Sequence, residues 1–303
     1  MVDSVDIYFI QWKMNQIYIC IVRKRMESPI WKIESIPAFC ITLERRKDRW
    51  KRFQDQPGIR NMNIKRFIGV DGKTIDVKKD KRVGTLTKRS IIHKTRRAHE
   101  ELDSVGGVGC ALSHIALWQW MVDNNQELCM VMEDDAVIPT TFVKDGNQCI
   151  ADSMILQDPK KWDLWVIGAV CEELSRIPQE PAKSGIVRAG AFMLTHCYII
   201  TLRTAKRFLE DVYPIHCHID FWMSIYCHLN NLRIVHNPQF KLEQADVKTD
   251  IQNKDGCAIC MVPVDYKKTH TMITNSELMI ARSAEIVCIG IIGYWLYQRY
   301  ISK

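Results

Sequence analysis

The sequence predicts an α/β fold in which a mixed, mostly parallel sheet is flanked by helices. Short continuous apolar runs, typical of strands buried on both faces, alternate with longer segments whose apolar residues recur at helical spacing. The first pair is a strand from Ala38 to Leu43 that leads directly into a charged helical segment. In such sheets ligands bind beyond the carboxyl ends of the strands. The residues that follow each strand are therefore the first candidates for function.

Length and composition indicate a folded globular protein. The chain has 303 residues, of which 47% are hydrophobic and 25% are charged, enough to bury a core. No Pro-rich or Gly/Ser-rich linker, internal repeat or low-complexity tract divides the chain. We expect an N-terminal extension over residues 1–36, one main domain over 37–265, and a C-terminal tail over 266–303.

The positive charge is concentrated in one stretch. The formal net charge is +7, from 42 basic and 35 acidic residues, and much of the excess lies between Lys78 and Arg97. This basic stretch fits a solvated, mobile loop, an electropositive rim for a diphosphate or an acidic acceptor, or a nucleic-acid patch. The last is disfavoured because few aromatic residues interleave with the basic ones.

The cysteines favour a reducing compartment. The chain has twelve, scattered without the spacing of a disulfide framework. Cys257 and Cys260 have zinc-like spacing, but no matching second pair accompanies them. The pattern favours reduced thiols and a cytoplasmic protein.

The C-terminal tail leaves two alternatives open. Ile286 to Tyr297 carries no charge and ends in aromatic residues, as at a membrane interface. As a helix these residues span about 18 Å at about 1.5 Å per residue, short of the roughly 30 Å hydrocarbon core of a bilayer. Residues 284–301 therefore fit either membrane association or a helix packed on the main domain.

Acidic and basic residues follow several of the predicted strands. Leu43 ends the first strand, and Arg46 and Arg49 follow it. A second strand from Ile64 to Val70 ends at Asp71 and Gly72. The most informative stretch, from Gly107 to Ile138, places an amphipathic helix before a buried strand.

Three consecutive acids, Glu133, Asp134 and Asp135, end that strand. Holding three carboxylates together is costly unless something neutralises them. A divalent cation with hard oxygen ligands, Mg²⁺ or Mn²⁺, satisfies that requirement.

Taken in chain order, these motifs resemble glycosyltransferase family 25, which includes bacterial lipooligosaccharide galactosyltransferases and procollagen galactosyltransferases. The resemblance lies in the strand with its basic helix, Asp-Gly, Gly-x-Gly-Cys-x-x-Ser-His, and Glu-Asp-Asp, and extends from about Ala38 to about Gln252. It implies a nucleotide-sugar-binding sandwich of the GT-A type. The implied reaction is metal-dependent, inverting transfer of galactose or glucose from a UDP-sugar to an acceptor hydroxyl on a glycan, a protein or a lipid-linked sugar. The implied cofactor is Mn²⁺ or Mg²⁺.

The resemblance also assigns roles to residues. The donor-binding positions are Leu43, Arg46, Arg49, Asp71, Gly72, Gly109, Ser113, His114 and Asp134. The metal positions are Glu133, Asp135 and Asp250, with His236 as an alternative to Asp250. The catalytic positions are Asp135, through the metal, and Asp220, as the base that activates the acceptor.

Alternatives stay open beside these roles. Asp220 also suits a helix N-cap, and a lone histidine such as His114 often only packs in its helix. Thr249 stands where the family more often has serine. Two other functions remain: a non-catalytic family member that binds nucleotide sugar or glycan, and a basic scaffold that binds nucleic acid.

Overall fold

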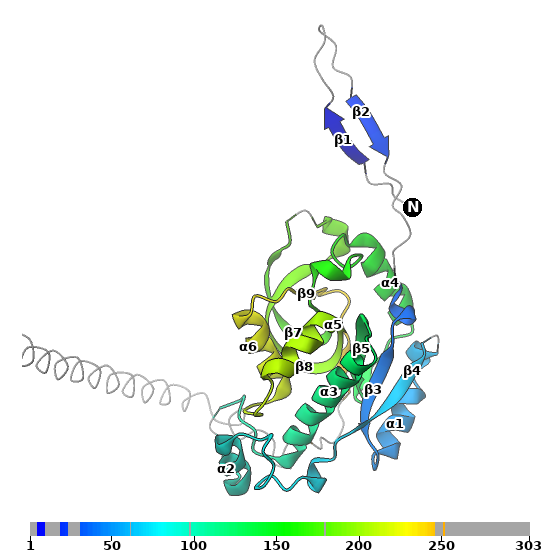
Figure 1. Cartoon of the computed structure of the whole chain (residues 1–303). Helices are drawn as coiled ribbons and strands as arrows, with labels where there is room; N and C mark the ends of the chain where they lie inside the picture. The colour runs from blue at the N-terminus through cyan, green and yellow to red at the C-terminus, as the bar shows by residue number, and fades with distance from the viewer. Residues whose placement is uncertain are drawn as a thin grey trace, which may run out of the picture. The chain divides into compact units, whose positions relative to one another are not determined.

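The computed structural model describes residues 5–9, 19–23, 31–60, 62–96, 98–178, 180–245 and 251 (Figure 1). Met1–Thr95 together with Glu100–Ile251 forms one compact unit, which contains the sheet. Asp250, the close cysteine pair and the apolar tail of residues 284–301 lie outside the described residues.

The unit is built on a six-stranded mixed sheet. Its strand order is β4 (Ile64–Gly69), β3 (Ala38–Leu43), β5 (Leu128–Glu133), β8 (Val187–Thr201), β7 (Leu164–Arg176) and β9 (Ile234–His236). The first three strands run parallel, and β9 runs parallel to β7. Only β8 runs antiparallel to its neighbours β5, β7 and β9. The predicted α/β fold with a mixed sheet is confirmed.

Helices cover both faces of this sheet (Figure 1). On one face lie α3 (Val105–Asp123), α5 (Leu202–Asp211) and α6 (Ile219–Leu229), and on the other lie α1 (Lys47–Gln54) and α4 (Phe142–Asp152). Alternate side chains of one strand enter the two cores: Cys129 and Val131 of β5 pack on the α3 side, whereas Met130 and Met132 pack on the α1 side. A strand buried on both faces explains the continuous apolar runs of the sequence.

The remaining elements are short. Two further antiparallel pairs join β1 (Val5–Phe9) to β2 (Ile19–Arg23) and β6 (Ala136–Val137) to β10 (Glu243–Gln244). The 3₁₀ turns are η1 (Ile33–Ser35), η2 (Pro57–Ile59), η3 (Gly72–Thr74), η4 (Pro159–Lys161) and η5 (Ala182–Ser184).

The basic stretch contains a helix, so the prediction of a mobile loop is wrong for this part. Helix α2 spans Thr85–His93 and buries Thr87 and Ile91. The Thr87 hydroxyl donates to the carbonyl of His216, 2.9 Å away. The helix is stabilised by contacts with a distant segment, which charge patterning alone does not reveal.

Helix α3 is the central core helix. By length and composition it is the one helix of the described chain that could cross a membrane, and 61% of the relevant window is buried. It packs between the sheet and α5. Its apolar character is therefore explained by burial in the core.

Asp163, at the start of β7, connects three segments at one edge of the sheet. One carboxylate oxygen accepts from Nε of Arg203 at 2.7 Å, and the other accepts from the backbone N–H of Arg233, also at 2.7 Å. Burial acts to raise the pKa of Asp163, but these hydrogen bonds outweigh it and lower the pKa below its usual value. The ionised form is thus favoured by the fold.

We predict that Asp163→Asn lowers the free energy of unfolding by about 1.5–3 kcal/mol at neutral pH, the range for hydrogen bonds to a charged group. Because folding lowers the pKa of Asp163, its contribution is present above the unfolded-state pKa and is lost as pH falls through the folded-state value. Urea unfolding at neutral and acidic pH should show the difference from wild type shrinking in acid. Asp123→Asn, on the exposed end of α3, should change stability little at either pH.

Candidate functional site

The carboxyl ends of β3, β4 and β5 meet at one edge of the sheet. Leu43 pairs with Gly69, and Ile41 pairs with Glu133, so the residues after these strands are neighbours. Asp71 and the three consecutive acids lie at this edge, which we call the acidic edge and define as Asp71 and residues 133–135. The sequence pattern predicted this convergence because parallel strands end on the same side.

Two arginines of α1 reach the acidic edge. Nη2 of Arg49 forms ion pairs with Asp134 and, at 2.9 Å, with Asp135. Nη2 of Arg52 donates to the backbone carbonyl of Asp134 at 2.7 Å. Arg49 and both acids are buried. The basic helix predicted after the first strand therefore neutralises part of the charge on these acids.

Asp135 retains unsatisfied hydrogen-bonding capacity. Its Oδ2 also accepts from Nε2 of Gln244 at 3.2 Å, but its buried Oδ1 has no hydrogen-bond partner among the described residues. Burial and the neighbouring charge of Glu133 raise the pKa of Asp135 to about 6, against the opposing effect of Arg49. Burial also raises the pKa of Asp134. Negative charge at this edge is therefore only partly compensated.

Asp135 offers one ligand of the kind that a divalent cation takes. Its buried Oδ1, without a partner among the described residues, is a hard oxygen ligand of the type that Mg²⁺ and Mn²⁺ favour. Asp250, one predicted ligand, lies outside the described residues. The alternative, His236, is buried in β9, where Nδ1 lies 3.0 Å from the carbonyl of Val166.

Glu133 lies in a second environment on the α3 side. Its Oε1 accepts from the Thr195 hydroxyl at 2.7 Å and lies 3.3 Å from Nε2 of His114. Ligand atoms of Cys110, His114 and Glu133 all lie within 4.8 Å of one another. Burial acts to raise the pKa of Glu133, but the hydrogen bond of His114 leads the effects that lower it overall, and the hydrogen bond of Thr195 adds to it.

Tyr198 and Trp118 complete the surroundings of His114. The Tyr198 hydroxyl lies 2.9 Å from Nδ1 of His114 and accepts from Nε1 of Trp118 at 2.9 Å. Sequence reasoning did not find Tyr198, Trp118 or Thr195. The i, i+4, i+8 spacing of Cys110, His114 and Trp118 on one helix face was the available signal for Trp118.

Three of the predicted donor-binding residues hold α3 against the turn after β4. The Ser113 hydroxyl accepts from the backbone N–H of Val70 at 2.8 Å and donates to the carbonyl of Gly109 at 2.6 Å. A Cβ on Gly109 would lie 2.6 Å from the carbonyl oxygen of Val70, and one on Gly72 would lie 2.0 Å from that of Val105. Packing therefore accounts for these residue types, and their contact with a donor stays a prediction. His114 is likewise fully buried.

Asp71 and Arg46 already have side-chain partners. Asp71 caps η3 by accepting from the N–H of Lys73 at 3.0 Å, and it pairs with Nε of Arg45 at 2.6 Å. Burial acts to raise the pKa of Asp71, but these two partners lower it overall. Arg46 binds Asp48 through Nε and Nη2, at 3.0 and 2.9 Å. Arg45 was not predicted as part of the site.

Asp220 lies in the first turn of α6, and the N-cap is His218, so the N-cap alternative for Asp220 is wrong. Its Oδ2 accepts from the backbone N–H of Leu194 at 2.8 Å, and its Oδ1 accepts from that of Phe221 at 2.8 Å. Leu194 has a φ of 72°, a left-handed conformation that costs a non-glycine residue about 1–3 kcal/mol. Asp220 thus stabilises a strained residue next to Thr195, which in turn binds Glu133.

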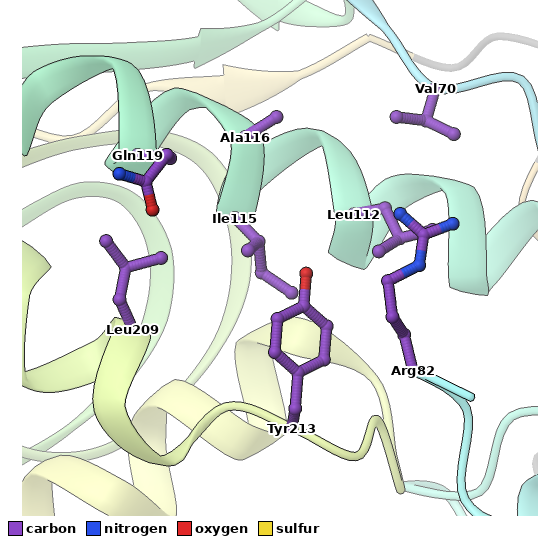
Figure 2. A pocket seen from close by; sticks show the side chains of 8 residues that line it. All are labelled: Val70, Arg82, Leu112, Ile115, Ala116, Gln119, Leu209 and Tyr213. Atoms are coloured by element: carbon purple, nitrogen blue, oxygen red, sulfur yellow. The ribbon is translucent and has the colours of Figure 1, made fainter. Parts of the chain in front are cut away.

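A separate surface pocket of about 290 Å³ lies along α3 (Figure 2). Its lining is mostly apolar, with polar groups from Arg82, Gln119 and Tyr213, whose hydroxyl points toward α3 in Figure 2. The full lining is Val70, Arg82, Leu112, Ile115, Ala116, Gln119, Leu209 and Tyr213. At helical spacing, Leu112, Ala116 and Gln119 point away from the face that carries His114. The pocket is therefore distinct from the surroundings of Glu133.

Comparison with known proteins identifies the family. A family model described as "Glycosyltransferase family 25 (LPS biosynthesis protein)" matches residues 35–223, well over half of the chain. The chain belongs to glycosyltransferase family 25. The matched segment runs from just before β3 into α6 and so includes the three acids and Asp220. The predicted resemblance is confirmed, and membership favours glycosyl transfer as the general class of reaction.

Curated relatives support the same family. A protein of Anopheles gambiae named "Glycosyltransferase 25 family member" is 29% identical over 178 residues, 57% of this chain and 28% of the relative. Human procollagen galactosyltransferase 2 is 27% identical over 172 residues, 56% of this chain and 26% of the relative. A rat protein named "Probable inactive glycosyltransferase 25 family member 3" is 26% identical over 180 residues, 59% of this chain and 30% of the relative. The match covers less than a third of each of these relatives.

We predict that Gly109→Ala lowers the free energy of unfolding by about 1–3 kcal/mol, as overpacking does. The new Cβ meets backbone atoms of the turn after β4, which outweighs the better helix propensity of alanine. Gln119→Ala on the exposed face of α3 should stay within about 0.5 kcal/mol of wild type. A Gly109→Ala protein with wild-type stability in urea but no binding of UDP would show that Gly109 contacts the donor instead.

Proposed function

We propose that the protein transfers a hexose from a UDP-sugar to an acceptor hydroxyl with the assistance of Mn²⁺ or Mg²⁺. One observation carries the proposal: a buried carboxylate oxygen of Asp135 at the acidic edge has no hydrogen-bond partner within the described part of the chain, in a member of glycosyltransferase family 25. The names of two relatives, the procollagen galactosyltransferases of Danio rerio and Homo sapiens, support galactose as the sugar. UDP-glucose is the second donor.

The residues at and around the acidic edge have different proposed roles. Asp135 and Glu133 would hold the cation, with Asp250 as a further ligand. The bound cation would act as a Lewis acid and neutralise charge that develops on the leaving diphosphate. Arg49 and Gln244 fix the Asp135 carboxylate in advance, so little reorganisation is needed when the donor binds.

The proposed donor site extends along the same edge. Leu43 ends β3, Arg46 follows it, and Asp71 follows β4. Asp71 is held by Arg45, which suits a carboxylate that receives a ribose or base edge. Gly72, Gly109, Ser113 and His114 support this site from α3 and its adjoining turn. The acceptor is a hydroxyl of a glycan, a protein or a lipid-linked sugar.

Asp220 is our proposed base for inversion. Inverting transfer needs a carboxylate that takes the proton of the acceptor hydroxyl on the face opposite the leaving group. Asp220 is only partly buried, and each of its oxygens accepts one backbone N–H. Each carboxylate oxygen has a second lone pair, so these contacts fix its orientation and leave proton-accepting capacity.

The second candidate is a non-catalytic member that binds nucleotide sugar. The name of the rat relative favours it, because similar sequence in this family does not guarantee turnover. The two candidates differ in one measurable property, since both bind UDP-sugar but only the enzyme hydrolyses or transfers it.

We predict that Asp135→Asn lowers Mn²⁺-dependent hydrolysis of UDP-galactose or UDP-glucose by at least about 100-fold, the loss typical when one group that stabilises the leaving charge is removed. Thermal unfolding should confirm that the variant folds. Asp55→Asn, an exposed acid at the end of α1, is the matched control and should retain full activity. If Asp135→Asn hydrolyses UDP-sugar like wild type, the metal assignment fails.

We predict that Asp220→Asn lowers the turnover number by about 10²–10⁴-fold, the usual contribution of a general base, while calorimetry finds UDP affinity unchanged. Leu194→Gly is the matched control, because it relieves the left-handed residue without removing the carboxylate. If Asp220 were purely structural, Asp220→Asn would instead lose stability and UDP affinity together with turnover, whereas Leu194→Gly would keep all three. The acidic limb of the pH–rate profile should be present in Leu194→Gly and altered in Asp220→Asn.

A further inference from the structure

A chain of buried hydrogen bonds leads from the core to the acidic edge. It runs from Nε1 of Trp118 to the Tyr198 hydroxyl, from that hydroxyl to Nδ1 of His114, and from Nε2 of His114 to Oε1 of Glu133. The first two steps measure 2.9 Å and the last 3.3 Å. Trp118, Tyr198 and His114 are all at most 1% exposed, so water does not satisfy these groups.

The inventory of hydrogens decides the direction of the chain. The Trp118 indole can only donate, so the Tyr198 oxygen accepts there. Tyr198 has one hydrogen of its own, and the remaining partner of its hydroxyl among the described residues is Nδ1 of His114. Nδ1 must therefore accept. A neutral imidazole then carries its hydrogen on Nε2, where it points at the Glu133 carboxylate.

The other protonation states of His114 leave a buried hydrogen without an acceptor. If Nδ1 were protonated, in the other neutral tautomer or in the imidazolium, it would donate to the Tyr198 oxygen. The Tyr198 hydrogen would then have no acceptor among the described residues, and such a buried donor is costly. The structure of the core thus favours one tautomer.

We infer that Tyr198 fixes His114 as the neutral tautomer protonated on Nε2, and that Tyr198 and His114 are positioning residues for the Glu133 carboxylate. Thr195 binds the same carboxylate oxygen from β8 at 2.7 Å. Side chains from α3 and from β8 therefore hold the carboxylate of Glu133. This residue directly precedes Asp134 and Asp135 in the chain. The functional consequence, correct placement of Glu133 for the cation, rests on the proposed function.

The inference also gives the cluster of Cys110, His114 and Glu133 a role other than zinc binding. Its ligand atoms are close enough to hold a metal ion, and cysteine and histidine suit zinc. A metal ion binds Nε2 through its lone pair. In the favoured tautomer Nε2 carries a hydrogen and has no lone pair to offer. Zinc binding would therefore reverse the hydrogen bond to Tyr198 and leave its hydroxyl hydrogen unsatisfied.

Nitrogen NMR tests the tautomer without any assay of activity. In the full chain labelled with ¹⁵N-histidine, long-range proton–nitrogen correlations distinguish protonated from unprotonated ring nitrogens for each of the nine histidines. The signals missing from His114→Gln assign His114. We expect an unprotonated Nδ1 and a protonated Nε2, unchanged when Zn²⁺ is added. A protonated Nδ1, or loss of the Nε2 hydrogen with Zn²⁺, would overturn the inference.

Variants test the positioning role. Glutamine at residue 114 can accept from Tyr198 and donate to Glu133, whereas alanine can do neither. We expect His114→Ala and Tyr198→Phe each to lower the turnover number by about 10–100-fold, the range for residues that orient metal ligands. His114→Gln should retain most of the activity that His114→Ala loses. Equal loss in His114→Gln and His114→Ala, with both folded, would contradict the role. Failure of the proposed function would give a different result. The wild-type protein would then show no turnover, while His114 would still be found in the predicted tautomer.

Discussion

The structure depends on how three consecutive carboxylates are held at the end of one buried strand. Like charges at this spacing repel, and burial increases the cost. The fold compensates from two sides: Arg49 and Arg52 of α1 reach Asp134 and Asp135, while His114 and Thr195 hold Glu133. One oxygen of Asp135 is left without a partner among the described residues. Because this carboxylate oxygen can still accept a ligand, the charge cluster is a candidate binding site.

Helix α3 shows why a family motif need not be a list of ligand contacts. In Gly-x-Gly-Cys-x-x-Ser-His, the glycine at position 109 and the serine at position 113 let the helix approach the turn after β4. The same close approach carries His114 to the end of β5, where it meets Glu133. In this structure the glycine and the serine of the motif make packing contacts, and its histidine contacts an acid at the end of β5.

The sequence predicted those features that depend on local pattern. Continuous apolar runs identified β3 and β5, helical spacing identified α3, and the rule for parallel strands placed the acids at one edge. The antiparallel insertion of β8 beside β5 was beyond reach, because its pairing is decided by long-range register. Thr195 and Tyr198 belong to that strand and were therefore missed. Helix α2 was missed for a related reason, since contacts with a distant segment, such as that between Thr87 and His216, stabilise it.

Residues beyond the segment matched by the family model also hold the acidic edge. The match ends at residue 223, yet Gln244 of β10 donates to Asp135, and the backbone N–H of Ala245 donates to the Asp135 carbonyl at 2.8 Å. A rat relative is named "Probable inactive glycosyltransferase 25 family member 3", so family membership by itself does not establish turnover. The geometry around Asp135 depends on β10 and the residue after it as directly as on the motif itself.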